Sequence, residues 1–185
     1  MRSVEIVKVM ESSVLISLGN NIKALLHQVH LADGGTTSLA NSKTKSKYKE
    51  GVKLDAVRVL TVDVVNRKCY VTAKKSLVGD SKKIISGLGA LEVNDVGTGF
   101  VSQVVEQGVV VTFYGNAYGF VSAKLLAEEM GVEDPRVNYK IGDVVKARVV
   151  GKYMRKVSER SGAERSGVEW GGGVEEDENM SHYEN

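Results

Sequence analysis

The sequence predicts an all-β protein made of two small barrels in tandem, with a disordered C-terminal tail. Three observations lead to this fold class. Residues 6–33 are repeated at residues 101–128 under a constant shift of 95 positions. Within each copy apolar and polar residues alternate, which is typical of half-buried strands. From Gly151 onward the composition changes to a low-complexity, acidic segment that is poor in aliphatic residues.

The repeat divides the chain into folding units. Equivalent positions carry like residues, as in Val9 and Val104, Glu11 and Glu106, or Leu31 and Leu126. Each copy of an internal repeat is expected to be one unit, and 185 residues leave room for two small domains. We therefore expect a first barrel over residues 1–78, a linker over 79–94, a second barrel over 95–150 and a tail over 151–185.

The first copy contains five short segments with strand character. They are Val4–Val9, Val14–Leu18, Ile22–Leu26, Lys53–Val62 and Lys68–Ala73. The run Gly19-Asn20-Asn21 is typical of a hairpin turn, and a long polar loop separates the third segment from the fourth. Five short strands with one long connection after the third are typical of the oligonucleotide- or oligosaccharide-binding barrel, the OB-fold.

The second copy shows the same order but ends early. Its predicted strands are Gly99–Val105, Val109–Phe113, Tyr118–Val121 and Val144–Val150, with a helix over Ala123–Met130. Nothing after Val150 matches the fifth strand of the first copy, so we expect an incomplete second barrel. The tail cannot bury enough apolar surface to offset its ordering entropy, and we expect it to be disordered, with Trp170 exposed. These features predict a fragment of a longer repeat protein, or a gene model with a wrong end.

Charge is distributed unevenly along the chain. Residues 1–83 carry 15 Lys and Arg against 7 Asp and Glu, whereas residues 84–150 carry 5 against 8. The basic residues of the first copy include Lys43, Lys45, Lys47 and Lys49 in the long loop, and Lys74 and Lys75 after the fifth strand. This asymmetry predicts that the first barrel meets a polyanion. The alternative is that the lysines only solubilise a small domain.

Several classes of function lack support in the sequence. The single Cys69 cannot form an internal disulfide, and no Cys/His cluster has the spacing of a metal site. No apolar stretch reaches membrane-spanning length. Gly87-Leu88-Gly89 lacks the GKS/T context of a phosphate-binding loop, and no Ser/His/Asp or paired-carboxylate constellation can be assembled. We therefore expect no catalytic residues, no metal and no cofactor.

Two runs of the second copy, GVVVTFYGNAYGFVSAKLL and YKIGDVVKARVV, carry a pattern that the first copy completes with RVLTVD and VTAKKSL. Together they resemble the S1 RNA-binding domain, an OB-fold family, over about residues 4–78 and 95–150. The runs HLAD, VTAKKSL and VTFYGNAYGFV further resemble the tandem-S1 pre-rRNA processing scaffolds of the eukaryotic small-subunit processome. The resemblance implies a non-catalytic protein of the nucleus and nucleolus. Its implied partners are single-stranded or precursor ribosomal RNA and ribosome-assembly proteins, with no membrane and no small-molecule substrate.

The resemblance also implies which residues bind RNA. S1 domains carry two aromatics flanking a glycine on the face formed by the second and third strands, and a histidine after the third. An aspartate and an arginine, four residues apart, follow in the turn between the fourth and fifth strands. In the first copy this set is matched by His27, Asp63 and Arg67, whereas Ser12 and Leu15 stand at the aromatic positions. Asp63 and Arg67 are interpreted either as a turn-closing ion pair or as RNA contacts, and the two roles can coexist.

The second copy departs further from the S1 pattern. The aromatic and histidine positions are occupied by Gln107, Val110 and Ser122. Rings are instead concentrated around the hairpin, at Phe113, Tyr114, Tyr118 and Phe120. Strand alternation places Tyr118 and Phe120 on one face of the sheet. We expect Phe120 in the core and Tyr114 exposed at the turn, so Tyr114 and Tyr118 are the candidate stacking residues.

Two functions follow from these patterns. In the first, the chain is a non-catalytic pair of RNA-binding modules from a ribosome-assembly scaffold, which the S1 pattern and the basic first copy support. In the second, the barrels are degenerate S1 modules that dock assembly proteins within the pre-ribosome. The missing stacking rings and the acidic second copy support this alternative.

Overall fold

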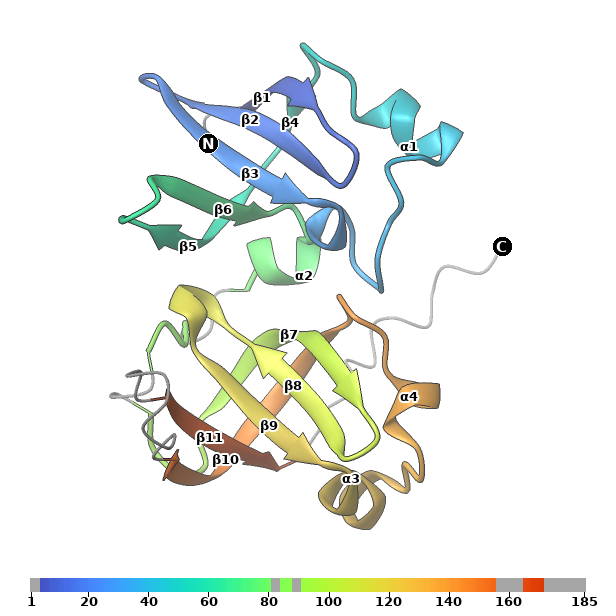
Figure 1. Cartoon of the computed structure of the whole chain (residues 1–185), viewed down its shortest axis with the longest axis vertical. Coiled ribbons are helices and arrows are strands. Elements are labelled where there is room, and N and C mark those ends of the chain that lie inside the picture. Colours follow the sequence, from blue (N-terminus) through green and yellow to red (C-terminus); the bar gives the residue numbers. More distant parts are fainter. Residues whose placement is uncertain (1–3, 81–83, 88–90, 156–164, 172–185) are drawn as a thin grey trace.

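The protein consists of two β-barrels that lie one above the other along its long axis (Figure 1). The computed structural model describes residues 4–80, 84–87, 91–155 and 165–171, and side chains beyond residue 151 are not described. The all-β class with two OB-type barrels, predicted from the sequence, is confirmed.

The first barrel is a curled six-stranded sheet in the order β4-β1-β2-β3-β6-β5. Its strands are β1 (Val4–Val9), β2 (Ser13–Gly19), β3 (Ile22–His27), β4 (Lys53–Leu54), β5 (Arg58–Asp63) and β6 (Lys68–Thr72). The helical segments are η1 (Gln28–His30), α1 (Ser42–Lys47) and α2 (Lys75–Val78). The single strand predicted over residues 53–62 is interrupted at residues 55–57 and forms both β4 and β5. Because these two edge strands belong to one segment, the sheet curls back on itself.

The second barrel is closed, with the strand order β10-β11-β9-β8-β7. Its strands are β7 (Val96–Val105), β8 (Gly108–Thr112), β9 (Tyr118–Ser122), β10 (Val144–Arg155) and β11 (Arg165–Gly171). The helical segments are η2 (Tyr114–Asn116), α3 (Ala123–Met130) and α4 (Pro135–Asn138). α3 has the predicted bounds because Ser122 caps its first turn and Gly131, with φ 65°, ends it.

The fifth strand of the second barrel is present, so the prediction of an incomplete barrel is wrong. β11 pairs antiparallel with β10, from Arg148–Gly171 to Arg155–Arg165, and parallel with β9 at Val168–Gly119. In the first barrel β6 pairs parallel with β3 in the same way. The segment RSGVEWG was missed because its composition is that of a polar loop. It forms a strand because β10 and β9 provide hydrogen-bonding partners on its two sides. The rest of the predicted disordered tail, residues 156–164 and 172–185, lies outside the described residues.

Both barrels have aliphatic cores built from equivalent repeat positions. Examples of equivalent positions that are buried in both barrels are Ile16 and Val111, Leu26 and Val121, and Leu31 and Leu126. Fully burying one such side chain contributes roughly 1.5–3 kcal/mol to folding. Because strand side chains alternate between faces, the residues between the buried ones point outward. On β3, Ala24 and Leu26 are buried, and Lys23, Leu25 and His27 lie on the outer face.

Candidate nucleic-acid interface

The two barrels are joined by direct contacts as well as by the chain between them. In one contact the Gly35 amide donates to Asp143 Oδ1 at 2.8 Å, and the Thr36 hydroxyl donates to the Ile141 carbonyl oxygen at 3.2 Å. A Cβ placed on Gly142 would lie 2.7 Å from the Gly35 carbonyl oxygen, so the two backbones approach closely here. The outer faces of the two barrels are therefore held against each other.

Tyr114 forms a second contact between the barrels, and the prediction that its ring is exposed is wrong. The side chain is only 6% exposed, because η2 packs against the end of the first barrel. Its hydroxyl donates to the Leu77 carbonyl oxygen at 2.9 Å, and its amide donates to the Ile85 carbonyl oxygen at 3.0 Å. The Arg58 guanidinium lies 5.8 Å from the ring centroid, a cation–π distance. Tyr114 therefore fixes the junction and has no ring face for a base.

Lys74 is also a junction residue, and its prediction as an RNA contact is wrong. The side chain is fully buried, and its ammonium donates to the Ala32 carbonyl oxygen. Burial lowers the pKa of Lys74, while the nearby carboxylates of Asp33 and Asp143 partly offset that effect. The neighbouring Lys75, predicted with it, is exposed. Sequence proximity to the other lysines therefore did not indicate where Lys74 points.

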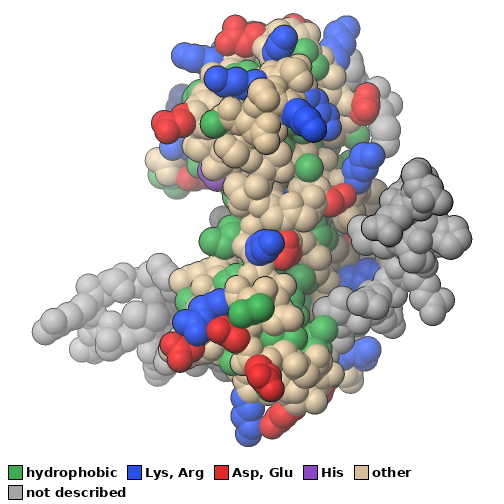
Figure 2. Space-filling model, turned by 90° about the vertical axis from the view of Figure 1, so that its right-hand side faces the viewer, with side chains coloured by type: hydrophobic (Ala, Val, Ile, Leu, Met, Phe, Trp, Pro, Cys, Tyr) green, Lys and Arg blue, Asp and Glu red, His purple; other side chains and the backbone are tan. Residues whose placement is uncertain are grey.

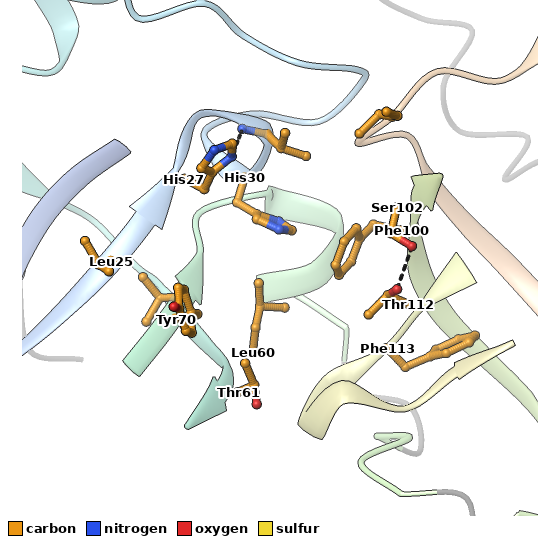
Figure 3. Close-up of a pocket in the computed structure, with 13 residues that line it drawn as sticks. Leu25, His27, His30, Leu60, Thr61, Tyr70, Phe100, Ser102, Thr112 and Phe113 are labelled. Atoms are coloured by element: carbon orange, nitrogen blue, oxygen red, sulfur yellow. Dashed lines mark hydrogen bonds between the residues drawn. The ribbon is translucent and has the colours of Figure 1, made fainter. Parts of the chain in front are cut away.

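A cleft of about 400 Å³ lies between the barrels. The first barrel lines it with outer-face residues of β3, β5 and β6, namely Leu25, His27, Leu60, Thr61 and Tyr70. The second barrel lines it from β7 and β8 with Phe100, Ser102 and Thr112. Figure 3 shows the two sets on opposite sides of the space, with His30 reaching across toward Phe100. Neither copy alone contains this cleft.

The His30–Phe100 contact closes one side of the cleft. The ring centroids are 4.5 Å apart and the planes are nearly perpendicular, an edge-to-face arrangement. The pKa of His30 is lowered to about 4, chiefly by burial and to a smaller extent by electrostatic interactions with Lys74 and His27. Its Nδ1 atom is buried without a hydrogen-bond partner among the described residues. His30 is therefore neutral at physiological pH.

Besides the imidazoles of His27 and His30, the polar side-chain groups in the cleft are hydroxyls. The Thr112 hydroxyl donates to Ser102 Oγ at 2.7 Å, and that hydroxyl donates to the Val110 carbonyl oxygen at 3.2 Å (Figure 3). The Tyr70 hydroxyl has no hydrogen bond with any residue that the structure describes. The cleft therefore combines rings and hydroxyls with no carboxylate or ammonium in its lining.

A pair of cations stands beside the cleft on the same outer face. Leu25 pairs with Tyr70 across the parallel strands β3 and β6. Lys23 and Lys68 each lie two residues earlier on these strands, so they share the outward face, roughly 7 Å along the strands. Both lysines are exposed. Sequence reasoning did not select them, although the alternation of Lys23, Leu25 and His27 placed Lys23 beside His27.

His27, predicted as an RNA ligand, is exposed and lines the cleft. Its Nδ1 atom also accepts a weak hydrogen bond from the Val29 amide at 3.4 Å, so His27 caps η1. Ser122 at the equivalent repeat position caps α3, where its hydroxyl accepts from the Leu125 amide at 3.3 Å. This position is therefore a helix cap in both barrels, and a role in binding would be additional.

The turn between β5 and β6 is not closed by the predicted ion pair. Asp63 and Arg67 are both described, and no ion pair joins them. Asp63 instead accepts hydrogen bonds from the Asn66 amide at 2.9 Å and from its Nδ2 at 2.7 Å, which lower the pKa of Asp63. Arg67 adopts a φ of 52° and is exposed. The structural interpretation of the pair is thus wrong, and the RNA-contact interpretation remains a prediction.

The predicted lysines of the long loop lie on another side of the first barrel. α1 begins at the Asn41 cap, whose Oδ1 accepts from the Lys43 amide at 3.1 Å. The exposed side chains are Lys43, Lys45, Lys47 and Lys49, and the Lys47 ammonium lies 5.5 Å from the Tyr48 ring centroid. In Figure 1 α1 is at the right of the barrel, whereas the turn between β5 and β6 is at its left. Figure 2 shows acidic side chains interspersed with the basic ones on the α1 side. The basic residues therefore do not form one patch.

Tyr118 and Phe120 share the outer face of the second barrel, so the expected core position of Phe120 is wrong. Both are half-buried and alternate with the buried Gly119 and Val121. Phe120 pairs with Val110, one of the positions where the S1 pattern has an aromatic. A Cβ on Gly108 would lie 2.7 Å from the tip of the Phe120 ring, so this ring covers the glycine. A ring missing from β8 is thus present on the neighbouring strand.

Neither a metal site nor a membrane-spanning helix is found in the described part of the chain. Among the described residues, no three His, Cys, Asp or Glu side chains are grouped so that they could hold a metal ion. Within the same ranges, no helix combines the length and hydrophobicity needed to cross a membrane.

Comparisons with known proteins give one family and several relatives. Residues 90–157, which include β7 to β10, match the S1 RNA binding domain family. This part of the chain is thus similar to S1 domains. The chain is also 23% identical over 145 residues to the rRNA biogenesis protein rrp5 of Schizosaccharomyces pombe, and 28% identical over 137 residues to the protein RRP5 homologs of Mus musculus and Homo sapiens.

The similarity covers most of this chain but little of its relatives. The matches cover 78% and 74% of the chain, and 8% and 7% of the fission yeast and mammalian proteins. The polyribonucleotide nucleotidyltransferase of Aquifex aeolicus is 34% identical over 104 residues, which are 56% of this chain and 12% of that protein. The chain therefore spans about a tenth of the length of the curated relatives it matches.

Proposed function

We propose that this chain is a non-catalytic RNA-binding part of a ribosome-biogenesis protein, and that its ligand is single-stranded precursor ribosomal RNA. The S1 match and the similarity to rRNA biogenesis proteins from fungi, animals and plants support this function. On the same basis we propose the nucleolus as its location and ribosome-assembly proteins as its partners.

The observation that carries the proposal is the outer face of the first barrel. Lys23 and Lys68 are exposed on β3 and β6, each two residues before the paired Leu25 and Tyr70, which line the cleft together with His27. Arg67 is exposed one residue before Lys68. Proteins that bind single strands without strong sequence preference combine cations along the phosphate path with rings on which bases stack. This face offers both.

A salt titration tests this proposal. Fluorescently labelled single-stranded RNA is titrated into the whole chain at several salt concentrations, and the affinity is followed by anisotropy. The double variant Lys23→Gln/Lys68→Gln is expected to bind more weakly and to lower the slope of log affinity against log salt by about 1.4, because each phosphate contact contributes about 0.7.

The control changes the same charge elsewhere on the same barrel. The double variant Lys45→Gln/Lys47→Gln alters α1, which lies away from the proposed RNA path, and is expected to keep the wild-type slope. If instead the α1 variant loses the slope and the outer-face variant keeps it, the outer face is not the RNA path.

A second candidate function, docking of assembly proteins, is favoured by one specific feature. Val64 and Val65, adjacent residues in the turn between β5 and β6, are 79% and 91% exposed. Two neighbouring exposed valines at a loop tip suit an apolar contact with a protein surface. If the wild-type chain binds no RNA at low salt, this second function becomes the better one.

A further inference from the structure

The cleft between the barrels has the size and lining of a small-ligand site. Its volume of about 400 Å³ falls within the usual range of roughly 300–1,000 Å³ for such sites. The walls are contributed by both barrels, and rings stand on each side, with Tyr70 on β6 and Phe100 on β7 (Figure 3). Flat, mostly apolar walls favour a planar ligand.

The polar groups of the cleft favour a neutral ligand over a charged one. The lining has hydroxyls from Thr61, Tyr70, Ser102 and Thr112 and the imidazoles of His27 and His30, with no carboxylate or ammonium among the residues that the structure describes. The Tyr70 hydroxyl has no hydrogen bond within this described part, so it can donate to a ligand. His30, at the edge of the cleft, is neutral above pH 4. A nucleobase is planar, neutral and rich in hydrogen-bond acceptors, and it matches this lining.

The cations beside the cleft indicate where the rest of the ligand lies. Lys23 lies two residues before Leu25, and Lys68 lies two residues before Tyr70, on the same face of the sheet. A phosphate held by these lysines is next to the opening, so the base attached to that backbone is within reach of the cleft. Single-stranded RNA is commonly recognised through such splayed-out bases.

We propose that the cleft between the two barrels takes up one unstacked base from the RNA strand whose phosphates lie along Lys23 and Lys68. The base stacks on Tyr70 and faces Phe100, so both barrels contribute to one nucleotide site. This inference rests on the proposed function and adds the binding site for an individual base. Because the contacts of Tyr114 and Gly35 hold the barrels together, the site exists without RNA.

The first test locates the base from the RNA side. A short labelled strand carries 2-aminopurine at each position in turn, and its fluorescence is read as wild-type chain is added at saturating concentration. One position is expected to lose fluorescence more strongly than the others, because stacking quenches this base. Removing the base at that position, to leave an abasic ribose, is expected to lower the affinity roughly 5- to 150-fold, the equivalent of one stacked base.

The second test links that position to the cleft. Tyr70→Leu is expected to lower the affinity by the same factor and to abolish the position-specific quenching, with the salt slope unchanged because no cation is removed. Combined with the abasic strand it should cause no further loss, because both changes remove the same interaction. Tyr118→Leu is the matched control. It removes a candidate stacking ring on the outer face of the second barrel that does not line the cleft, and is expected to leave the position-specific quenching unchanged.

The outcomes separate this inference from the function on which it rests. Salt-dependent RNA binding with equal quenching at every position overturns the base site and leaves the proposed function intact. Loss of quenching in Tyr118→Leu but not in Tyr70→Leu also overturns it, because the base then stacks on the second barrel. If the wild-type chain binds no RNA, both fall. The abasic series uses only wild-type protein, so the proposal can be tested even if Tyr70→Leu does not fold.

Discussion

The two barrels keep the same core positions but carry different chemistry on their outer faces. In the first barrel the outer strands present Lys23, His27 and Lys68, and the aromatic positions of the S1 pattern are lost. In the second, rings stand on the outer face at Phe100, Tyr118 and Phe120. The core sets which residues must be apolar, whereas the outer face is constrained only by what it contacts.

In the proposed function, the RNA-binding unit is therefore larger than one repeat. The first barrel has cations with few rings, and the second has rings with a negative charge balance. At the cleft, rings from both barrels face each other and the cations of the first barrel stand beside them. A single barrel would offer an incomplete site, and the pair offers a complete one.

The largest expected effect tests whether the two barrels are packed together. It is the dependence of the free energy of unfolding on pH that arises from His30 at the junction. In the unfolded chain its pKa is about 6.5, and in the folded junction it is about 4. As pH falls from 6.5 toward 4, the unfolded state takes up a proton that the folded state does not, so stability is lost over this window and the loss levels off below pH 4. The full effect is at most roughly 3 kcal/mol.

The measurement is chemical denaturation of wild type and His30→Phe at a series of pH values. The variant keeps a ring against Phe100 but has no group that titrates there, so its stability should fall less between pH 6.5 and 4. Parallel curves for the two proteins would show that His30 is not buried at a junction, and the two barrels would then be independent.

The next largest effect is the loss of stability when the hydroxyl of Tyr114 is removed, compared with that of Tyr118. Tyr114→Phe removes the hydroxyl that donates to the Leu77 carbonyl oxygen and leaves that buried acceptor unsatisfied, which is expected to cost roughly 1–3 kcal/mol. Tyr118→Phe removes a hydroxyl from the half-buried outer face and is expected to change stability by less than about 0.5 kcal/mol. Thermal unfolding followed by circular dichroism measures both. Equal melting temperatures for the two variants would contradict the role of Tyr114 in joining the barrels.

The smallest effect concerns the cap that both barrels place at the same repeat position. Ser122→Ala is expected to destabilise the protein by about 1 kcal/mol, because α3 loses the hydroxyl that accepts from the Leu125 amide. His27→Ala should cost less, since its bond to the Val29 amide is long, at 3.4 Å, and η1 is a single turn. Urea denaturation provides the comparison. A larger loss for His27→Ala would show that His27 contributes to folding through contacts other than its cap.

Much of the fold could be predicted because most strands show a local pattern of apolar and polar residues. β1 and α3 have the predicted bounds, and in β1 the buried Val4 and Ile6 alternate with the exposed Glu5 as the sequence pattern indicates. The fifth strand of the second barrel could not be predicted, because its Ser- and Gly-containing segment has no strand character of its own. Its pairing with β10 and β9 comes from two edges that already exist in space.

The candidate site was predicted less well, for a different reason. His27 was selected from the sequence and is exposed on the outer face, and its equivalence with Ser122 followed from the repeat. Lys74 and Tyr114 were wrong because both are buried by tertiary contacts, Lys74 at the Ala32 carbonyl oxygen and Tyr114 against the other barrel, which no sequence pattern describes. Lys23 and Lys68 were missed because their proximity depends on the parallel pairing of β3 with β6, across more than forty residues.

The repeat, most of the strands and the two aliphatic cores can be predicted from the sequence, because period-two alternation indicates which side of a strand is buried. Which outward-facing residues contact each other is set by the tertiary structure. A lysine and a tyrosine that would be exposed on isolated barrels are buried at the junction, and rings from distant segments line one cleft. The physical reason is that burial at a junction depends on the surface that is opposite a residue, and that surface is set by the packing of whole barrels.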